Sequence, residues 1–294
     1  MDRSLSFYSM KINRLLVALS LALISHHQLQ ADFHDHIGLQ LWSLRATALT
    51  KGLPASLDLA KKWGVVELEG ALVTPNMTPE QVRAALDARG LKMPSAHVQY
   101  ADLSKDLTPL IRAAQVLGVN YVICPWIPHL GAFTPRQIEA AAKIFNHAGA
   151  EFRAAGLKFG YHPHGYELIP TATAGETLLD DLIRATNPAD VCYQMDVFWI
   201  YHGGGDPVKL LNKYADRWVS LHVKDIRRAA PYGQPTGRAP DTDNVAVGSG
   251  QINWPAVIGT AEKIGVRYYF IEDETPAPLE NIPASLAYLH QLKL

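Results

Sequence analysis

Short apolar runs recur along the chain from residue 37 onward, and each is followed by a loop and then by a longer amphipathic segment. The runs are rich in Val, Ile, Leu and aromatic residues and do not alternate cleanly between apolar and polar positions. Strands that are buried on both faces show this pattern. Eight runs are found, at residues 37–42, 65–69, 92–97, 121–124, 158–162, 191–196, 218–223 and 267–272.

Helix-like segments separate the apolar runs. Segments 81–89, 107–117 and 135–155 each end directly before a glycine, which is the usual C-terminal stop of a helix, and a fourth opens at Trp254-Pro255. Strands that alternate with helices predict parallel β/α units, and eight units predict an α/β protein with a single (β/α)8 barrel over residues 32–294. A doubly wound open sheet is the competing fold, but no Gly-rich phosphate-binding loop follows any run.

The longest irregular stretch, residues 227–250, is rich in Pro, Gly, Asp and Arg and follows the seventh run. In a barrel, the loops after the strands surround the active face. We therefore expect this stretch to overhang that face as a lid.

Residues 1–31 have a different pattern. Lys11 and Arg14 precede an apolar run at residues 15–24, and a polar stretch then ends at Ala31. This order predicts a secretory signal peptide, and the apolar run is shorter than the about 20 residues that span a bilayer. We expect an exported protein, periplasmic or secreted, with no membrane span once the signal is removed.

Composition adds three points. The formal net charge of -1 gives no electrostatic reason to expect nucleic acid or an anionic membrane as a partner. Cys124 and Cys192 lie inside apolar runs, where free buried thiols or, in an exported protein, a disulfide are both open. The chain has 12 His residues, the side chain that most often binds metals. A homo-oligomer is compatible with the sequence.

Metal-competent side chains close several of the apolar runs, where barrel strands converge on one rim. His162, Asp196, His222 and Glu272 end the fifth to eighth runs. Burial of several ionisable groups without a counter-charge is costly, and a divalent cation would offset that cost. The pattern predicts one divalent metal, Mn, Zn, Fe or Co, because mixed imidazole and carboxylate ligands suit these ions. A structural polar network is the alternative.

Six short motifs in order resemble the sugar phosphate isomerase/epimerase family, the xylose isomerase-like barrels that also include apurinic-site endonucleases. They lie at residues 37–45, 159–167, 196–199 with 205–207, 222–225, 248–254 and 271–273. The second resembles the family's YHNHxxE segment, with Pro163 in place of Asn. The resemblance implies that the four residues named above hold the metal.

The resemblance also limits the chemistry. His162 stands where many family members carry a Glu that serves as a proton-transfer base, so the two-glutamate shuttle of ketose epimerases is not implied here. Apurinic-site endonucleases need further metal-binding His residues and a DNA-facing surface, which the sequence does not show clearly.

The expected reaction is proton abstraction next to a carbonyl of a sugar, with a metal that stabilises an enediolate. His164 is the first candidate for the base or acid, because an imidazole beside a cation tends to stay neutral. Glu167 is the second candidate. Lys224 is expected to hold a substrate oxygen or oxyanion, although a surface role is the alternative.

Five further side chains are expected to line the substrate pocket: Gln40, Glu67, His97, Trp126 and Trp199. The two Trp residues suit stacking on a sugar ring. For each of the five, a structural hydrogen bond or core packing is the alternative.

The family's breadth places an isomerase or epimerase first among the expected functions. A lyase that cleaves a keto-glycoside by β-elimination would use the same metal and base, and it suits an exported protein because sugar phosphates are rare outside the cytoplasm. A sugar-binding protein without turnover and a metal-dependent phosphoester hydrolase are the remaining alternatives.

Overall fold

Eight parallel strands close into a barrel in the order β1-β10-β7-β6-β5-β4-β3-β2. The computed structural model describes residues 32–294, so the predicted signal peptide lies outside the described residues. The strands are β1 (Ile37–Gln40), β2 (Glu67–Ala71), β3 (Lys92–His97), β4 (Tyr121–Cys124), β5 (Lys158–Tyr161), β6 (Val191–Asp196), β7 (Trp218–Val223) and β10 (Tyr268–Ile271). The predicted (β/α)8 fold is confirmed.

Strand positions follow the apolar runs closely. The bounds of β3, β4, β6 and β7 equal the predicted ranges, and β1, β5 and β10 are shorter than their runs at one or both ends. Only β2 extends beyond its run, because it begins at Glu67 and continues to Ala71.

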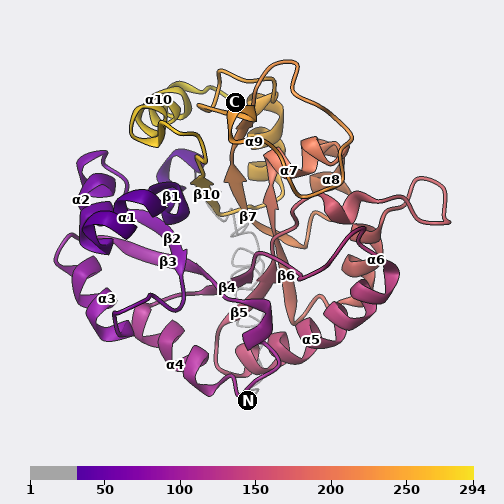
Figure 1. The fold of residues 1–294 in the computed structure, drawn as a ribbon, viewed down its shortest axis with the longest axis horizontal. Coiled ribbons are helices and arrows are strands. Elements are labelled where there is room, and N and C mark those ends of the chain that lie inside the picture. The colour runs from indigo at the N-terminus through magenta and orange to yellow at the C-terminus, as the bar shows by residue number, and fades with distance from the viewer. Residues whose placement is uncertain (1–31) are drawn as a thin grey trace, which may run out of the picture. The chain divides into compact units, whose positions relative to one another are not determined.

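Helices form a ring outside the strands (Figure 1). They are α1 (Arg45–Lys51), α2 (Leu53–Lys62), α3 (Pro79–Asp87), α4 (Thr108–Leu117), α5 (Pro135–Ala154), α6 (Leu178–Ala185), α7 (Val197–His202), α8 (Pro207–Lys213), α9 (Trp254–Lys263) and α10 (Pro278–Gln291). Thr78 begins α3 with a capping box, and Gly118 ends α4 in the left-handed conformation at φ 75°. Within residues 32–294, no helix has the length and apolar character needed to cross a membrane.

The apolar core lies between the barrel and this ring. Phe159 and Tyr161 of β5, for example, pack on Phe145 of α5. Because side chains alternate along a strand, the residues between them face the barrel interior. At the carboxyl end of the barrel, several buried side chains are polar: Gln40, Glu69, Ser95, Gln194, Ser220 and His222.

The predicted lid is partly ordered into secondary structure. Strands β8 (Asp225–Ile226) and β9 (Asn244–Val245) pair antiparallel, and we call the segment between them, residues 227–243, the strap. Tyr232 Oη donates a 2.7 Å hydrogen bond to Gly204 O, beyond α7. At Gly237, an added Cβ would lie 2.6 Å from Cδ1 of Tyr166, which follows β5. The strap therefore crosses the loops at the carboxyl end of the barrel, as expected.

Neither cysteine is paired. Cys124 is buried and Cys192 half-buried, and both are free thiols. Of the alternatives left open by the sequence, the structure has the free thiols.

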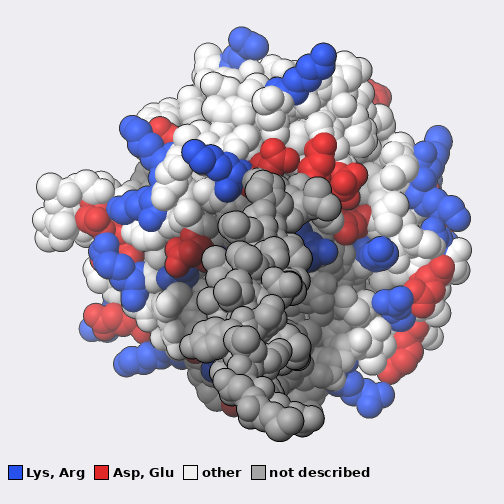
Figure 2. All heavy atoms as spheres, turned by 180° about the vertical axis from the view of Figure 1, so that it is seen from behind, with Lys and Arg blue, Asp and Glu red and all other residues white. Residues whose placement is uncertain are grey.

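Acidic and basic side chains are interspersed over the part of one face that residues 32–294 form in Figure 2, and neither sign extends across it. That visible area offers no broad basic surface of the kind that binds a nucleic-acid backbone.

Candidate metal centre

The four predicted metal ligands lie together at the carboxyl end of the barrel. Asp196 is the last residue of β6 and pairs in register with His222 of β7, whereas His162 and Glu272 directly follow β5 and β10. Asp196 and His222 are fully buried, and His162 is 1% exposed. Asp196 also begins α7, because its Oδ1 accepts a 2.9 Å hydrogen bond from Trp199 N. That bond aims the other oxygen, Oδ2, at the centre of the group.

The spacing of the ligand atoms suits one metal ion. His162 Nε2 lies 3.7 Å and His222 Nδ1 lies 3.8 Å from Asp196 Oδ2, and His222 Nδ1 lies 3.4 Å from Glu272 Oε2. Bonds of about 2.1 Å in a tetrahedron separate the ligand atoms by about 3.4 Å.

Two of these atoms lack a hydrogen bond. Asp196 Oδ2 and His222 Nδ1 are buried and have no hydrogen-bond partner among the described residues. Unsatisfied buried polar atoms are rare and costly, and a cation would satisfy both. The donor set therefore fits a divalent metal.

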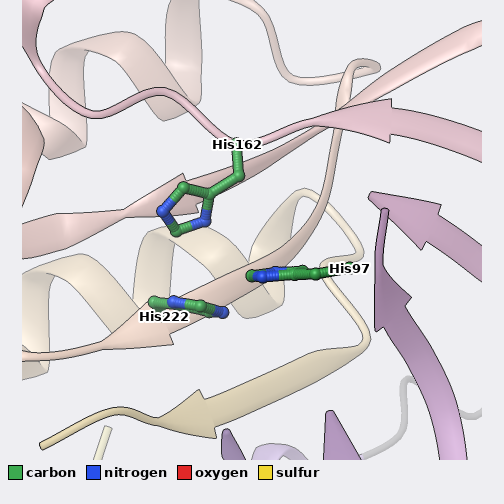
Figure 3. A group of neighbouring side chains, drawn as sticks. All are labelled: His97, His162 and His222. Carbon is green, nitrogen blue, oxygen red and sulfur yellow. The ribbon is translucent and has the colours of Figure 1, made fainter. Parts of the chain in front are cut away.

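A third imidazole, that of His97, lies beside the rings of His162 and His222. His97, at the end of β3, stacks on His222 with ring centroids 5.5 Å apart and an angle of 19° between the rings. Figure 3 shows His97, His162 and His222 converging from three strands, and their ligand atoms lie within 4.8 Å of one another. His97 Nε2 already contacts Gln194 Oε1 at 3.2 Å and Glu69 Oε1 at 3.1 Å. His97 therefore lies in the cluster itself, whereas it was predicted only to line the substrate pocket.

Glu69 of β2 is the buried carboxylate beneath the cluster, and it is not among the predicted site residues. Its five donors are Gln40 Nε2 at 2.8 Å, Gln194 Nε2 at 2.8 Å, His222 Nε2 at 2.5 Å, His97 Nε2 at 3.1 Å and Ser95 Oγ. Burial by itself raises the pKa of Glu69, but the neighbouring His97 and His222 outweigh it and hold that pKa well below its usual value. Glu69 is therefore ionised.

Glu67, the β2 residue that we expected in the pocket, lies at the other end of the barrel. It pairs in register with Lys92, the first residue of β3, and its Oε2 lies 3.1 Å from Nδ1 of His36, which precedes β1. This prediction is wrong, because the strand runs on past Glu67 and Glu69 is the carboxylate nearer the carboxyl end.

Gln40, also expected in the pocket, supports the network instead. Its Nε2 donates to Glu69 and its Oε1 accepts a 3.1 Å hydrogen bond from Trp42 N. At 2% exposure, it offers no free polar atom to a substrate.

Lys224 is a buried cation at the side of the cluster. Its Nζ lies 3.2 Å from Glu272 Oε2, contacts Glu274 Oε2, and sits 5.1 Å from the centroid of the Trp199 ring. Burial disfavours the ammonium form, but Glu272 and Glu274 outweigh this and raise the pKa of Lys224 above its usual value. The surface role weighed for Lys224 is wrong, since the side chain is 1% exposed.

His164 lies above the predicted ligands, among aromatic side chains. Its ring centroid is 4.7 Å from that of His162, 5.3 Å from Trp126 and 5.5 Å from Trp199. Burial, with a smaller contribution from the charge of Lys224, lowers the pKa of His164 to about 3. Its Nδ1 has no hydrogen-bond partner among the described residues, so a neutral imidazole with a free nitrogen stands beside the site.

Glu167, the second candidate base, does not join the cluster. Its Oε1 accepts hydrogen bonds from Tyr161 Oη and, at 3.3 Å, from His164 N. Tyr161 packs on α5, outside the barrel interior. Burial raises the pKa of Glu167 to about 7, and its Oε2 has no hydrogen-bond partner among the described residues. The role of Glu167 as a base stays a prediction.

The protonation of the remaining ligands follows from burial and charge. Burial raises the pKa of Asp196 to about 7. For His222, burial favours the neutral ring, but the charges of Glu69 and Glu272 outweigh it and raise the pKa to about 10. Burial lowers the pKa of His162 well below its usual value, and the other imidazoles add to that effect.

Comparison with known proteins identifies relatives of this barrel. Inosose dehydratase of Geobacillus kaustophilus (strain HTA426) is 28% identical over 171 residues, which are 51% of this chain and 54% of that protein. The inosose dehydratase of Lactiplantibacillus plantarum is 34% identical over 33% of this chain and 31% of its own. The chain thus spans about half the length, or less, of these curated relatives.

A solved structure, a sugar phosphate isomerase/epimerase from Parabacteroides distasonis ATCC 8503, is 26% identical with a TM-score of 0.71, over 87% of this chain and 98% of that one. The sequence model of the family described as xylose isomerase-like TIM barrel matches residues 57–292. The chain therefore belongs to the xylose isomerase-like TIM barrel family.

Proposed function

We propose that this protein is a metal-dependent enzyme that removes a proton next to a keto group of an unphosphorylated sugar or cyclitol and then eliminates a substituent from the neighbouring carbon. The observation that carries this proposal is the pair of buried atoms without a hydrogen bond, Asp196 Oδ2 and His222 Nδ1, with the neutral imidazole of His164 beside them. Relatives named inosose dehydratase and sugar phosphate isomerase/epimerase support carbohydrate chemistry at such a site.

His162, Asp196, His222 and Glu272 would hold the metal, and Mn, Zn, Fe and Co all suit these ligands. A bound divalent ion would supply Lewis acidity, which polarises the substrate carbonyl and stabilises the negative charge that develops when the neighbouring C–H bond breaks.

Two side chains, His164 and Lys224, then carry out the two proton transfers of the reaction. The free Nδ1 of His164 accepts the proton of the substrate carbon. Lys224, which carries its proton at neutral pH, donates it to the leaving oxygen as the C–O bond breaks and a C=C bond forms. The leaving group departs as water or an alcohol, and solvent then restores both side chains.

Isomerisation or epimerisation is the second candidate, because the Parabacteroides distasonis relative carries that name. Epimerisation through two carboxylates needs one on each side of the substrate. In this chain, the buried carboxylate nearest the predicted ligands, Glu69, is engaged by five donors. Glu167 accepts hydrogen bonds from Tyr161 Oη and His164 N through one oxygen only. One free base beside one ammonium fits elimination better.

The unphosphorylated substrate is supported by charge. Lys224 lies between Glu272 and Glu274, so its charge is already balanced before a substrate arrives. A phosphate dianion at that position would meet two carboxylates. The export proposed from residues 1–31 agrees with this substrate class. Hydrolysis of a phosphoester is correspondingly disfavoured.

Two measurements test the proposal. Metal analysis by mass spectrometry should find about one equivalent of Mn, Zn, Fe or Co in the wild type and much less in Asp196→Ala and His222→Ala. Keto-sugars, keto-glycosides and keto-cyclitols incubated in D2O should then exchange the proton next to the carbonyl and lose water or an alcohol, both in a metal-dependent manner.

Exchange without loss of water or alcohol would favour isomerisation. Metal binding without exchange would favour a sugar-binding protein. A wild type that takes up none of the four ions would refute the metal site itself.

A further inference from the structure

Glu69 is the buried carboxylate that contacts His222 directly and His162 through Gln194. Both of its oxygens are occupied by donors from five different residues, which come from β1, β3, β6 and β7. A carboxylate has only acceptor atoms. Every group that points at Glu69 must therefore present a hydrogen, and this fixes how each of those groups is oriented.

The first consequence concerns His222. Its Nε2 lies 2.5 Å from Glu69 Oε1, so this nitrogen carries the hydrogen. The opposite nitrogen, Nδ1, then faces Asp196 Oδ2 and Glu272 Oε2, at 3.8 Å and 3.4 Å. A ring flip would turn a C–H group toward the carboxylate, which disfavours the alternative orientation.

The second consequence reaches His162 through Gln194. The amide nitrogen of Gln194 donates to Glu69 Oε2 at 2.8 Å and to Ser220 Oγ at 3.0 Å. The amide oxygen must then face the other way, where it accepts from His162 Nδ1 at 2.9 Å. The hydrogen of His162 is thereby placed on Nδ1, and Nε2 is left free at 3.7 Å from Asp196 Oδ2.

We infer that Glu69 is a positioning residue that sets which nitrogen of His222 and of His162 is available to a metal ion. A residue that accepts a hydrogen bond from the nitrogen of a ligating imidazole that does not bind the metal typically raises metal affinity about 10- to 100-fold. The inference rests on the proposed function, because it concerns the same metal.

Glu69→Gln is the sharpest variant, because an amide has nearly the same shape but only one acceptor. If its oxygen faces His222, its NH2 group meets the NH2 group of Gln194, which must flip and turn its own NH2 toward His162. If its oxygen faces Gln194, its NH2 group meets the Nε2–H of His222 instead. Either way, one of the two imidazoles loses its acceptor and moves its hydrogen to the nitrogen that faces the metal.

The experiment uses the full chain in two states. Long-range 1H–15N spectra of 15N-His protein report the hydrogen position of His162 without metal and of His222 with Zn, and competition with a chromophoric chelator reports Zn affinity. The wild type should show hydrogen on Nδ1 of His162 and on Nε2 of His222. Glu69→Gln should change one of these assignments and lower Zn affinity about 10- to 100-fold.

Ser220→Ala is the matched control. It removes one partner of the Gln194 amide but leaves Glu69 in place, so both hydrogens should stay as in the wild type. If Glu69→Gln does not fold, Gln194→Leu replaces it, because this variant removes the acceptor of His162 and leaves the hydrogen bond between Glu69 and His222 in place. It should alter the hydrogen position of His162 and leave His222 unchanged.

Unchanged hydrogen positions together with wild-type Zn affinity in Glu69→Gln, or an unchanged His162 in Gln194→Leu, would overturn the inference. Its failure is separate from that of the proposed function. A wild type that binds no metal would refute the proposed function. A wild type and a Glu69→Gln variant that bind Zn equally well would refute only the role of Glu69.

Discussion

Metal binding should release protons, and its affinity should therefore fall steeply as the pH falls. The carboxylates of Glu69 and Glu272 outweigh burial and raise the pKa of His222 to about 10, so that in the metal-free protein the ring is protonated at neutral pH. A metal that takes Nδ1 must displace that proton. Below the raised pKa, each unit of pH then costs about a factor of ten in affinity.

The expected size follows from the two ligands with raised pKa values. Between about pH 8 and about pH 6, His222 alone weakens binding about 100-fold. Burial raises the pKa of Asp196 to about 7, so this group is ionised at the upper end of the range and mostly protonated at the lower end. Asp196 adds about a further factor of ten over the same interval. The pKa of His162 is lowered, so its ring is already neutral and contributes nothing.

Isothermal titration calorimetry of the metal-free protein with Zn, repeated in buffers of different ionisation enthalpy, counts the protons released. About one proton should be released at pH 8, and more as the pH approaches 6. His162→Gln, the control, should weaken binding but keep the release from His222, whereas His222→Gln should lose it. Tight binding with no proton released, or an affinity that does not change with pH, would refute the reasoning.

Three further outcomes are expected. Lys224→Met should keep the bound metal, measured by mass spectrometry, but lower kcat about 100- to 10,000-fold if the ammonium is the acid; an unchanged kcat would contradict that role. Gly237→Ala should lower the midpoint of thermal unfolding, because φ 63° disfavours a side chain and the new Cβ would press on Tyr166. Leu39→Ala leaves a cavity at a fully buried position of β1 and should lower the free energy of unfolding, measured with urea, by about 2–5 kcal/mol. A loss of less than about 1 kcal/mol would contradict the close packing of Leu39.

The barrel could be predicted from the sequence because each strand is short and apolar, and several strands end at or directly before a polar residue. His162, Asp196, His222 and Glu272 follow four different strands, and the closure of the barrel alone brings such residues to one rim. Their convergence therefore needs no knowledge of side-chain contacts. The pairing of Asp196 with His222 in the strand register confirms the reasoning for that pair.

Glu69 ends the second apolar run, residues 65–69, but the prediction for the pocket chose Glu67, and the sequence alone does not separate the two. Glu67 and Glu69 lie two residues apart in one strand, so both point into the barrel, and only the register with neighbouring strands separates them. Glu69 pairs with Gln40, the last residue of β1, whereas Glu67 pairs with the first residue of β3. A single sequence contains no such register. Gln194 and Glu274 were not predicted because neither ends an apolar run.

The position of Glu167 depends on a local turn that the sequence motif does not reveal. Gly165, at φ 80°, reverses the chain, and a Cβ there would lie 2.3 Å from Trp199 O, so only glycine fits this close approach. The turn carries Glu167 back toward Tyr161 and leaves His164 near the predicted ligands. The spacing of the motif is compatible with either residue as the base, and the turn places the ring of His164 against that of His162.

The contrast between two layers of the barrel locates the ligand site. The layer below the rim is polar and buried, where branched apolar residues are usual, and its members satisfy one another: Gln40, Glu69, Ser95, Gln194 and Ser220. Directly above it, Asp196 Oδ2 and His222 Nδ1 are equally buried but have no hydrogen-bond partner in residues 32–294. If both layers were purely structural, the buried polar atoms of each would find hydrogen-bond partners within the protein. Of the two layers, the upper one has the atoms without hydrogen bonds, and these atoms are spaced as metal ligands are. This contrast supports the proposed metal at the rim.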